Sequence, residues 1–248
     1  MTASTTPAVL DVHDLSLSAA GRSLVAHLGF SVLPGERWCV IGRNAAGKST
    51  LLRALAGLAV PQRSGTVTLS GGTSVLGDSA GAAWLRAYLP QQPNDRFDLT
   101  VREWLALHQR PGSVQEPSLE RLTASLDVVH LLDRPVTQLS GGERQRVGLA
   151  AVAAQDAAVW LLDEPVSFQD PAHQRTLSHW LRVQRQRAIV MSAHDMGWVQ
   201  HCATHVIALQ GTGAWCAGPV AQQLSTATLQ ATFDCQWHCV QGLWLPVD

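Results

Sequence analysis

One glycine-rich segment of this sequence ends in a lysine and a serine. Residues 42–49 read G-R-N-A-A-G-K-S and fit the G-x-x-x-x-G-K-[ST] pattern of a phosphate-binding loop. In such a loop, backbone amides and the positive end of the next helix surround the phosphates, the lysine reaches the β and γ groups, and the serine ligates magnesium. We therefore expect this loop to bind ATP and Mg2+. Lys48 would both bind ATP and take part in catalysis, and Ser49 would be a ligand of the magnesium ion. The expected ATP contacts are Gly42, Arg43, Asn44, Ala45, Ala46, Gly47, Lys48, Ser49 and Thr50.

Two adjacent carboxylates follow an apolar run later in the chain. Residues 159–162 read V-W-L-L, typical of a buried strand, and Asp163 and Glu164 come directly after them. At the carboxyl edge of a parallel sheet the pair would lie beside the phosphate loop. We expect Asp163 to hold the magnesium shell and Glu164 to orient or deprotonate the water that attacks the γ-phosphate. An acidic pair alone is more often a capped strand end, so this interpretation depends on the loop upstream.

A third segment lies between the other two, in a stretch with helical character. It consists of Leu139, Ser140, Gly141, Gly142, Glu143, Arg144 and Gln145. Ser140 and Glu143 have the S/T-x-x-E spacing of a capping box at a helix N-terminus, and the two glycines there favour an anion site. A capping box alone would explain Ser140 and Glu143 but not the remaining residues in this order. The sequence contains no second phosphate loop that would fill this anion site.

With these three segments in this order, the sequence resembles the ATP-binding cassette (ABC) family over roughly residues 10–218. The resemblance implies that the Ser140 segment grips the γ-phosphate of ATP held by a second copy of the chain, in a homodimer. It also implies that Gln91 senses magnesium and the attacking water, and that Asp170 lies in a loop that crosses the dimer interface. His194 would hydrogen-bond the γ-phosphate. Taken singly these are ordinary structural residues, and their order carries the resemblance.

The hydrophobic pattern predicts the elements that must position these residues. Alternation near residues 15–18 and 65–72 favours strands of an early antiparallel sheet, and residues 49–56 have helical periodicity. Apolar runs at 37–41, 159–162, 188–191 and 205–209 predict the strands of the core, the last three as strands buried on both faces of a parallel sheet.

We expect an α/β fold: a phosphate-loop NTPase core with a mainly parallel sheet, an N-terminal antiparallel β subdomain and an inserted helical subdomain. Residues 1–248 would form a single domain. The core with its β subdomain would comprise residues 8–94 and 155–248, and the helical subdomain residues 95–154, which include a break at Pro111-Gly112.

The sequence departs from the family pattern in three places. Ala45 replaces a usual glycine of the phosphate loop, and if the position needs a positive φ, alanine costs about 1 kcal/mol. Ala19 or Ala20 occupies the position where the family often stacks an aromatic ring on adenine. Phe168-Gln169 replaces the usual small residue and leucine, so the detail of the interface loop is open.

Composition excludes some classes of function. Hydrophobic residues make up 46% and charged residues 15% of the chain, which excludes a disordered chain and favours a surface that meets a partner. The net charge is −1, and the Lys and Arg residues are scattered along the sequence rather than clustered, so no nucleic-acid partner is expected. No apolar run reaches the roughly 18 residues of a membrane span, and the start resembles no signal peptide. The Cys235, His238 and Cys239 cluster is a weak metal-site pattern.

The resemblance implies an ATPase subunit that docks under transmembrane permease subunits at the cytoplasmic face of the cell membrane. Residues around Phe97 to His108, with Trp104, Leu105 and Leu107, are the expected docking segment, with a place in the core as the equal alternative for each of these three. Cassettes of importers for vitamin B12, haem and iron-siderophore chelates are the most similar group, with vitamin B12 first, so a substrate-binding protein is an indirect partner. The alternatives are an exporter cassette, a cassette ATPase acting on nucleic acid or ribosomes, and a degenerate cassette without turnover.

Overall fold

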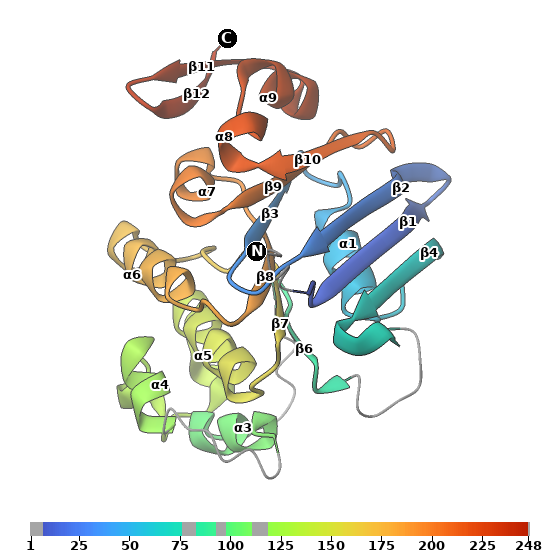
Figure 1. Cartoon of the computed structure of the whole chain (residues 1–248). Coiled ribbons are helices and arrows are strands. Elements are labelled where there is room, and N and C mark those ends of the chain that lie inside the picture. The colour runs from blue at the N-terminus through green and yellow to red at the C-terminus, as the bar shows by residue number, and fades with distance from the viewer. Residues whose placement is uncertain (1–6, 76–82, 93–97, 111–118, 248) are drawn as a thin grey trace, which may run out of the picture.

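The computed structural model describes residues 7–75, 83–92, 98–110 and 119–247 (Figure 1). Phe97 of the expected docking segment and the expected break at Pro111-Gly112 lie outside the described residues. The strands that are described form two larger sheets and a terminal hairpin. Among the described residues no helix is long and apolar enough to cross a membrane.

The N-terminal sheet is antiparallel, as the alternating pattern predicts. It contains β1 (Leu10–Ala19), β2 (Arg22–Val32), β4 (Gln62–Leu69) and β5 (Thr73–Ser74), in the order β2-β1-β4-β5. Alternate β1 side chains, such as Leu10 and Val12, are buried, and a register shift falls between Val12 and Leu15. The alternation of buried and exposed side chains shifts by one residue at this point, because a β-bulge inserts an extra residue into the strand. The strand expected to continue to Gly72 ends at Leu69, where a 3-10 turn, η1 (Ser70–Gly72), begins.

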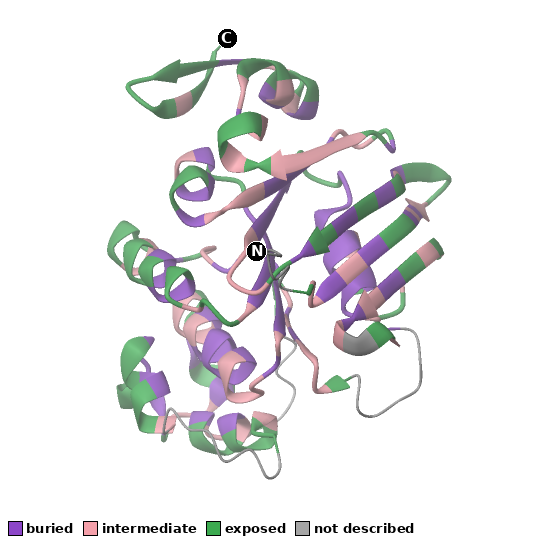
Figure 2. Cartoon of the chain, in the orientation of Figure 1, coloured by how far each residue is buried: buried purple, intermediate pink, exposed green. Residues whose placement is uncertain are grey.

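The second sheet carries the predicted parallel strands. Its order is β10-β9-β3-β8-β7-β6, and every neighbouring pair is parallel except β9 and β10. Its strands are β3 (Arg37–Gly42), β6 (Arg86–Leu89), β7 (Val159–Leu162), β8 (Ala188–Ser192), β9 (His205–Leu209) and β10 (Trp215–Pro219). Every residue of β7 and β8 is buried, and Figure 2 shows these strands in the buried centre of the fold. The continuous apolar runs of β7 and β8 are therefore explained, because both faces of the sheet are covered there and neither side of these strands meets solvent.

Helices flank the sheets. The helix α1 (Lys48–Leu55) follows β3, one residue earlier than expected, and lies between the two larger sheets (Figure 1). The region between β6 and β7 contains α3 (Val101–His108), α4 (Leu119–Ser125), the 3-10 turns η2 (Val129–Leu131) and η3 (Val136–Gln138), and α5 (Gly141–Ala154). Both predicted capping boxes are confirmed, at Thr100 with Glu103 and at Ser140 with Glu143.

The remaining helices and the terminal hairpin come after β7 in the chain. They are α6 (Pro171–Arg182), α7 (Met196–Cys202), α8 (Val220–Gln223), α9 (Thr226–Phe233) and the hairpin of β11 (Gln236–Val240) and β12 (Leu243–Val247). The hairpin is held to the fold by Trp237, which is buried against Phe233. The predicted fold class is confirmed by this arrangement of a mainly parallel sheet, an antiparallel N-terminal sheet and a helical insertion, whereas the exact subdomain boundaries stay a prediction.

Candidate nucleotide site

The phosphate loop joins β3 to α1 and depends on two glycines with positive φ. Gly42 has φ 153 and Gly47 has φ 106. A Cβ on Gly42 would lie 2.7 Å from the Leu209 carbonyl oxygen, and a Cβ on Gly47 would lie 2.9 Å from Leu24 Cβ. Both positions therefore exclude a side chain, through the backbone conformation and through the packing.

Ala45 occupies the left-handed region, with φ 61. The structure thus requires a positive φ at the position where the family usually carries glycine. For an L-residue with a Cβ, this conformation is unfavourable by about 1 kcal/mol. The loop keeps its shape here at a local energetic cost.

Lys48 lies at the centre of the loop. Its side chain is 6% exposed, and its Nζ donates to the carbonyl oxygens of Gly42 at 2.9 Å and of Arg43 at 3.1 Å. Burial lowers the pKa of Lys48, and the nearby carboxylates of Glu164 and Asp163 act in the opposite direction. The ammonium is therefore tethered by two carbonyls, close to the two acidic residues.

The two carboxylates stand at the end of β7, and a serine at the end of β8 connects them. The Ser192 hydroxyl donates to Asp163 Oδ1 at 2.6 Å and accepts from the Glu164 backbone N–H at 2.9 Å. Asp163 is only 2% exposed and forms no ion pair with any residue that the structure describes. A buried carboxylate that accepts a hydrogen bond from a serine hydroxyl offers the kind of oxygen ligand that a magnesium ion prefers.

The Glu164 carboxylate is held from three sides. Its Oε2 accepts hydrogen bonds from Gln91 Nε2 and Ser167 Oγ, each at 2.9 Å, and its Oε1 lies 2.6 Å from His194 Nε2. Glu164 itself has φ 50. Gln91 follows β6 and His194 follows β8, the two neighbours of β7, so the parallel sheet brings these side chains to one edge.

An open cleft of about 570 Å³ lies above this cluster. A volume of this size is in the usual range for small-molecule sites. The phosphate loop forms one wall of the cleft, the β1–β2 turn forms another, and the described lining includes no aromatic ring. Its lining residues are Ala19, Ala20, Arg22, Leu24, Asn44, Ala45, Gly47, Lys48, Ser49, Thr50, Gln91 and Glu164.

The Ser140 segment does not line this cleft. Ser140 is the exposed N-cap of α5, and its hydroxyl accepts from the Glu143 N–H at 3.3 Å. The bond from Ser140 N–H holds the pKa of Glu143 below its usual value. Behind this turn, Gln145 is buried and donates to the Glu164 carbonyl at 3.1 Å. Leu139 is buried beneath the turn and Arg144 lies partly buried beside η3.

Asp170 is the N-cap of α6. Its carboxylate accepts from the His173 N–H at 2.9 Å, and this bond lowers the pKa of Asp170. It lies at the end of the segment that begins with Glu164, outside the cleft.

Sequence reasoning missed the roles of Ser192 and Ser167, the two hydroxyls that bond the acidic pair. A polar residue that ends an otherwise apolar buried strand was the available signal for Ser192. The described residues contain no group of three or more His, Cys, Asp and Glu side chains that could hold a metal ion, and Cys239 is exposed on the hairpin.

The sequence profile described as ABC transporter matches residues 25–167. The chain belongs to the ABC transporter family. This cassette is accordingly an ATP-binding ATPase subunit. It is 33% identical over 236 residues to the achromobactin transport ATP-binding protein of Dickeya dadantii, which covers 90% of this chain and 87% of that protein.

A second relative and a solved structure are also similar to this chain. The cassette is 41% identical over 178 residues to the vitamin B12 import ATP-binding protein of Citrobacter koseri, covering 68% of this chain and 70% of that protein. Its fold matches an ABC transporter solved in an inward-facing conformation with a TM-score of 0.77 at 24% identity, over 98% of each chain.

Proposed function

We propose that this cassette hydrolyses ATP as a homodimer, with each nucleotide held between the phosphate loop of one copy and the Ser140 segment of the other. One observation carries the proposal. The exposed N-terminus of α5 lies outside the chain's own cleft, whereas Lys48 and Glu164 line that cleft. A helix N-terminus that offers free amides attracts phosphate, and a second copy can supply that phosphate.

Within each site the residues divide the chemistry. Gly42 to Thr50 would cradle the phosphates, and Lys48 would release its loop carbonyls to reach the β and γ groups. Ser49, Asp163 and Gln91 would hold Mg2+, which supplies charge neutralisation at the phosphates. Glu164 would take the proton of the attacking water, and His194 would bond the γ-phosphate.

The coupling to a membrane permease would use the exposed side of α3. Leu105 is fully buried, so of its two interpretations, docking residue and core residue, it is a core residue. Leu107 is 70% exposed, and Trp104 is half-buried beside it. Permease subunits that dock there would hold the cassette at the cytoplasmic face of the membrane, as a peripheral subunit.

For the cargo we propose vitamin B12 or a related metal chelate, such as haem or an iron-siderophore, delivered by a substrate-binding protein. The similarity to the Citrobacter koseri protein supports the corrinoid first. The cassette itself does not contact the cargo, so an exporter cassette is the second candidate.

The test is reconstitution of the cassette with its permease in lipid vesicles, followed by ATP hydrolysis with binding protein loaded with corrinoid, haem or ferric siderophore. We expect stimulation by one loaded binding protein, and hydrolysis lowered by at least about 10²-fold in a Glu164→Gln control. Hydrolysis without any permease association would contradict the transport role and favour action on nucleic acid or ribosomes.

A further inference from the structure

The segment from Glu164 to Asp170 is hydrogen-bonded to α5 of the same chain, the helix that begins after Ser140. Gln145 of α5 donates to the Glu164 carbonyl at 3.1 Å. Five residues after Glu164, Gln169 is buried at 9% exposure although it is polar. A buried side-chain amide needs partners for both its donor and its acceptor, so its contacts show what holds it there.

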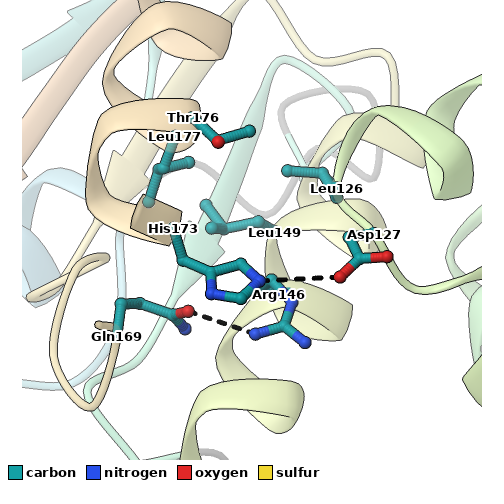
Figure 3. A pocket seen from close by; sticks show the side chains of 8 residues that line it. All are labelled: Leu126, Asp127, Arg146, Leu149, Gln169, His173, Thr176 and Leu177. Atoms are coloured by element: carbon teal, nitrogen blue, oxygen red, sulfur yellow. Dashed lines mark hydrogen bonds and ion pairs between the residues drawn. The ribbon is translucent and has the colours of Figure 1, made fainter. Parts of the chain in front are cut away.

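Gln169 uses both ends of its amide on α5. Its Nε2 donates to the Gly142 carbonyl at 2.8 Å, and its Oε1 accepts from Arg146 Nη1 at 3.2 Å, the bond drawn in Figure 3. Gly142 and Arg146 are four residues apart, so they lie on one face of the helix. Among the described residues, Gln169 is the hydrogen-bond partner of the Arg146 guanidinium, whose Nε is buried without one. The Gln169 amide therefore forms hydrogen bonds to both the first and the second turn of α5.

The backbone next to Gln169 is pressed against the same turn. A Cβ on Gly142 would lie 2.8 Å from the Phe168 carbonyl oxygen, and a Cβ on Gly141 would lie 3.3 Å from the Phe168 ring. Phe168 also has φ 63, an uncommon conformation for a residue with a large side chain. Gly142 is therefore required for the close approach of this segment, in addition to any anion binding, whereas a Cβ on Gly141 would need only a small shift of the exposed Phe168 ring.

We infer that Gln169 is a positioning residue of the hydrolysis reaction. Its amide fixes the position of the Ser140 segment relative to Glu164. The Ser140 segment contacts the ATP bound to the second copy, whereas Glu164 acts on the ATP bound to its own chain. The inference rests on the proposed function, since only a composite site needs the two to be held in register. Gln169 lines no part of the nucleotide cleft. It acts through α5 and touches no reacting atom.

The test compares Gln169→Met, which keeps the length and apolar volume but removes both bonds, with Gln174→Met. Gln174, on α6, is a matched control because its amide donates at 3.1 Å to the Gln169 carbonyl and has no described hydrogen bond to α5. We expect Gln169→Met to lower kcat about tenfold, the effect of losing a buried hydrogen bond, while KM and the Kd for ATP change less than about twofold. Gln174→Met should keep kcat within about twofold of the wild type.

Gln169→Glu keeps the contact with Arg146 but sets a carboxylate oxygen against the Gly142 carbonyl in place of the donor, so its kcat should also fall below that of wild type. It also serves if thermal melting shows that Gln169→Met does not fold. Wild-type kcat in the folded Gln169 variants, or a raised KM with unchanged kcat, would overturn the inference. A wild-type protein without magnesium-dependent hydrolysis would instead overturn the proposed function, so the two failures are distinct.

Discussion

His194 Nε2 lies 2.6 Å from Glu164 Oε1, although the two residues are 30 positions apart. The contact exists because Glu164 follows β7 and His194 follows β8, and these strands are parallel neighbours. Gln91 and Ser167 hold the other carboxylate oxygen. The carboxylate is therefore oriented by three side chains, which is the arrangement that a general base requires.

Glu164→Gln should lower kcat by about 10²- to 10⁴-fold, because an amide cannot accept the proton of the attacking water. ATP affinity should be kept, since Lys48 and the loop amides are unchanged. Phosphate release and nucleotide titration measure the two effects. The control is Glu120→Gln, in the first turn of α4, which should hydrolyse ATP as the wild type does. Wild-type turnover in Glu164→Gln would exclude Glu164 as the base.

Ala45→Gly and Ala46→Gly test the strain in the phosphate loop. Ala45 has φ 61, so glycine there relieves about 1 kcal/mol of strain and offsets its own entropic cost. Ala46 is 3% exposed with an ordinary φ, so glycine there loses a buried methyl group and destabilises the fold by about 1 kcal/mol. Urea unfolding should show Ala45→Gly as the more stable variant. The reverse order would mean that the loop is not strained at Ala45.

Ser192→Ala removes the hydroxyl that bonds both Asp163 and the Glu164 N–H. Losing a buried hydrogen-bond partner should destabilise the fold by about 1–3 kcal/mol and lower kcat, because both acidic residues lose their restraint. Thr232→Val is the control: its hydroxyl is also buried, but it donates to Thr228 O within α9. Both variants should unfold more readily, and only Ser192→Ala should lose activity. Equal kcat values would show that Ser192 has no part in orienting the pair.

The cysteines should differ in reactivity. Burial raises the pKa of Cys39 and raises the pKa of Cys202 to about 11, so both thiols stay protonated at about pH 8, where the thiolate is the reacting form. Cys239 is exposed. Iodoacetamide and mass spectrometry should find Cys239 modified first, and Cys39 and Cys202 modified only after denaturation. Early modification of Cys39 in the native protein would mean that the core opens readily.

Local sequence patterns predicted the elements whose residues are close together in the chain. The phosphate loop, the acidic pair after β7 and both capping boxes needed only short-range spacing. The contacts of Ser192 and Gln169 could not be predicted from local spacing. Those of Ser192 depend on the strand register that pairs Leu162 with Met191, and those of Gln169 depend on the packing of α5 against the segment after Glu164. The bulge in β1 and the terminal hairpin also escaped prediction, because tertiary packing rather than local periodicity determines them.

The most direct test of the composite site mixes two inactive variants. Lys48→Ala removes the phosphate-binding lysine but leaves the Ser140 turn intact, and Ser140→Arg blocks that turn but leaves the phosphate loop and Glu164 intact. Their mixed dimer contains one complete site, so we predict that hydrolysis is absent in each variant alone and returns on mixing, up to about a quarter of the wild-type rate. If the mixture stays inactive while both variants are folded and still form dimers with wild-type chains, the nucleotide is not shared between two copies and the account is wrong.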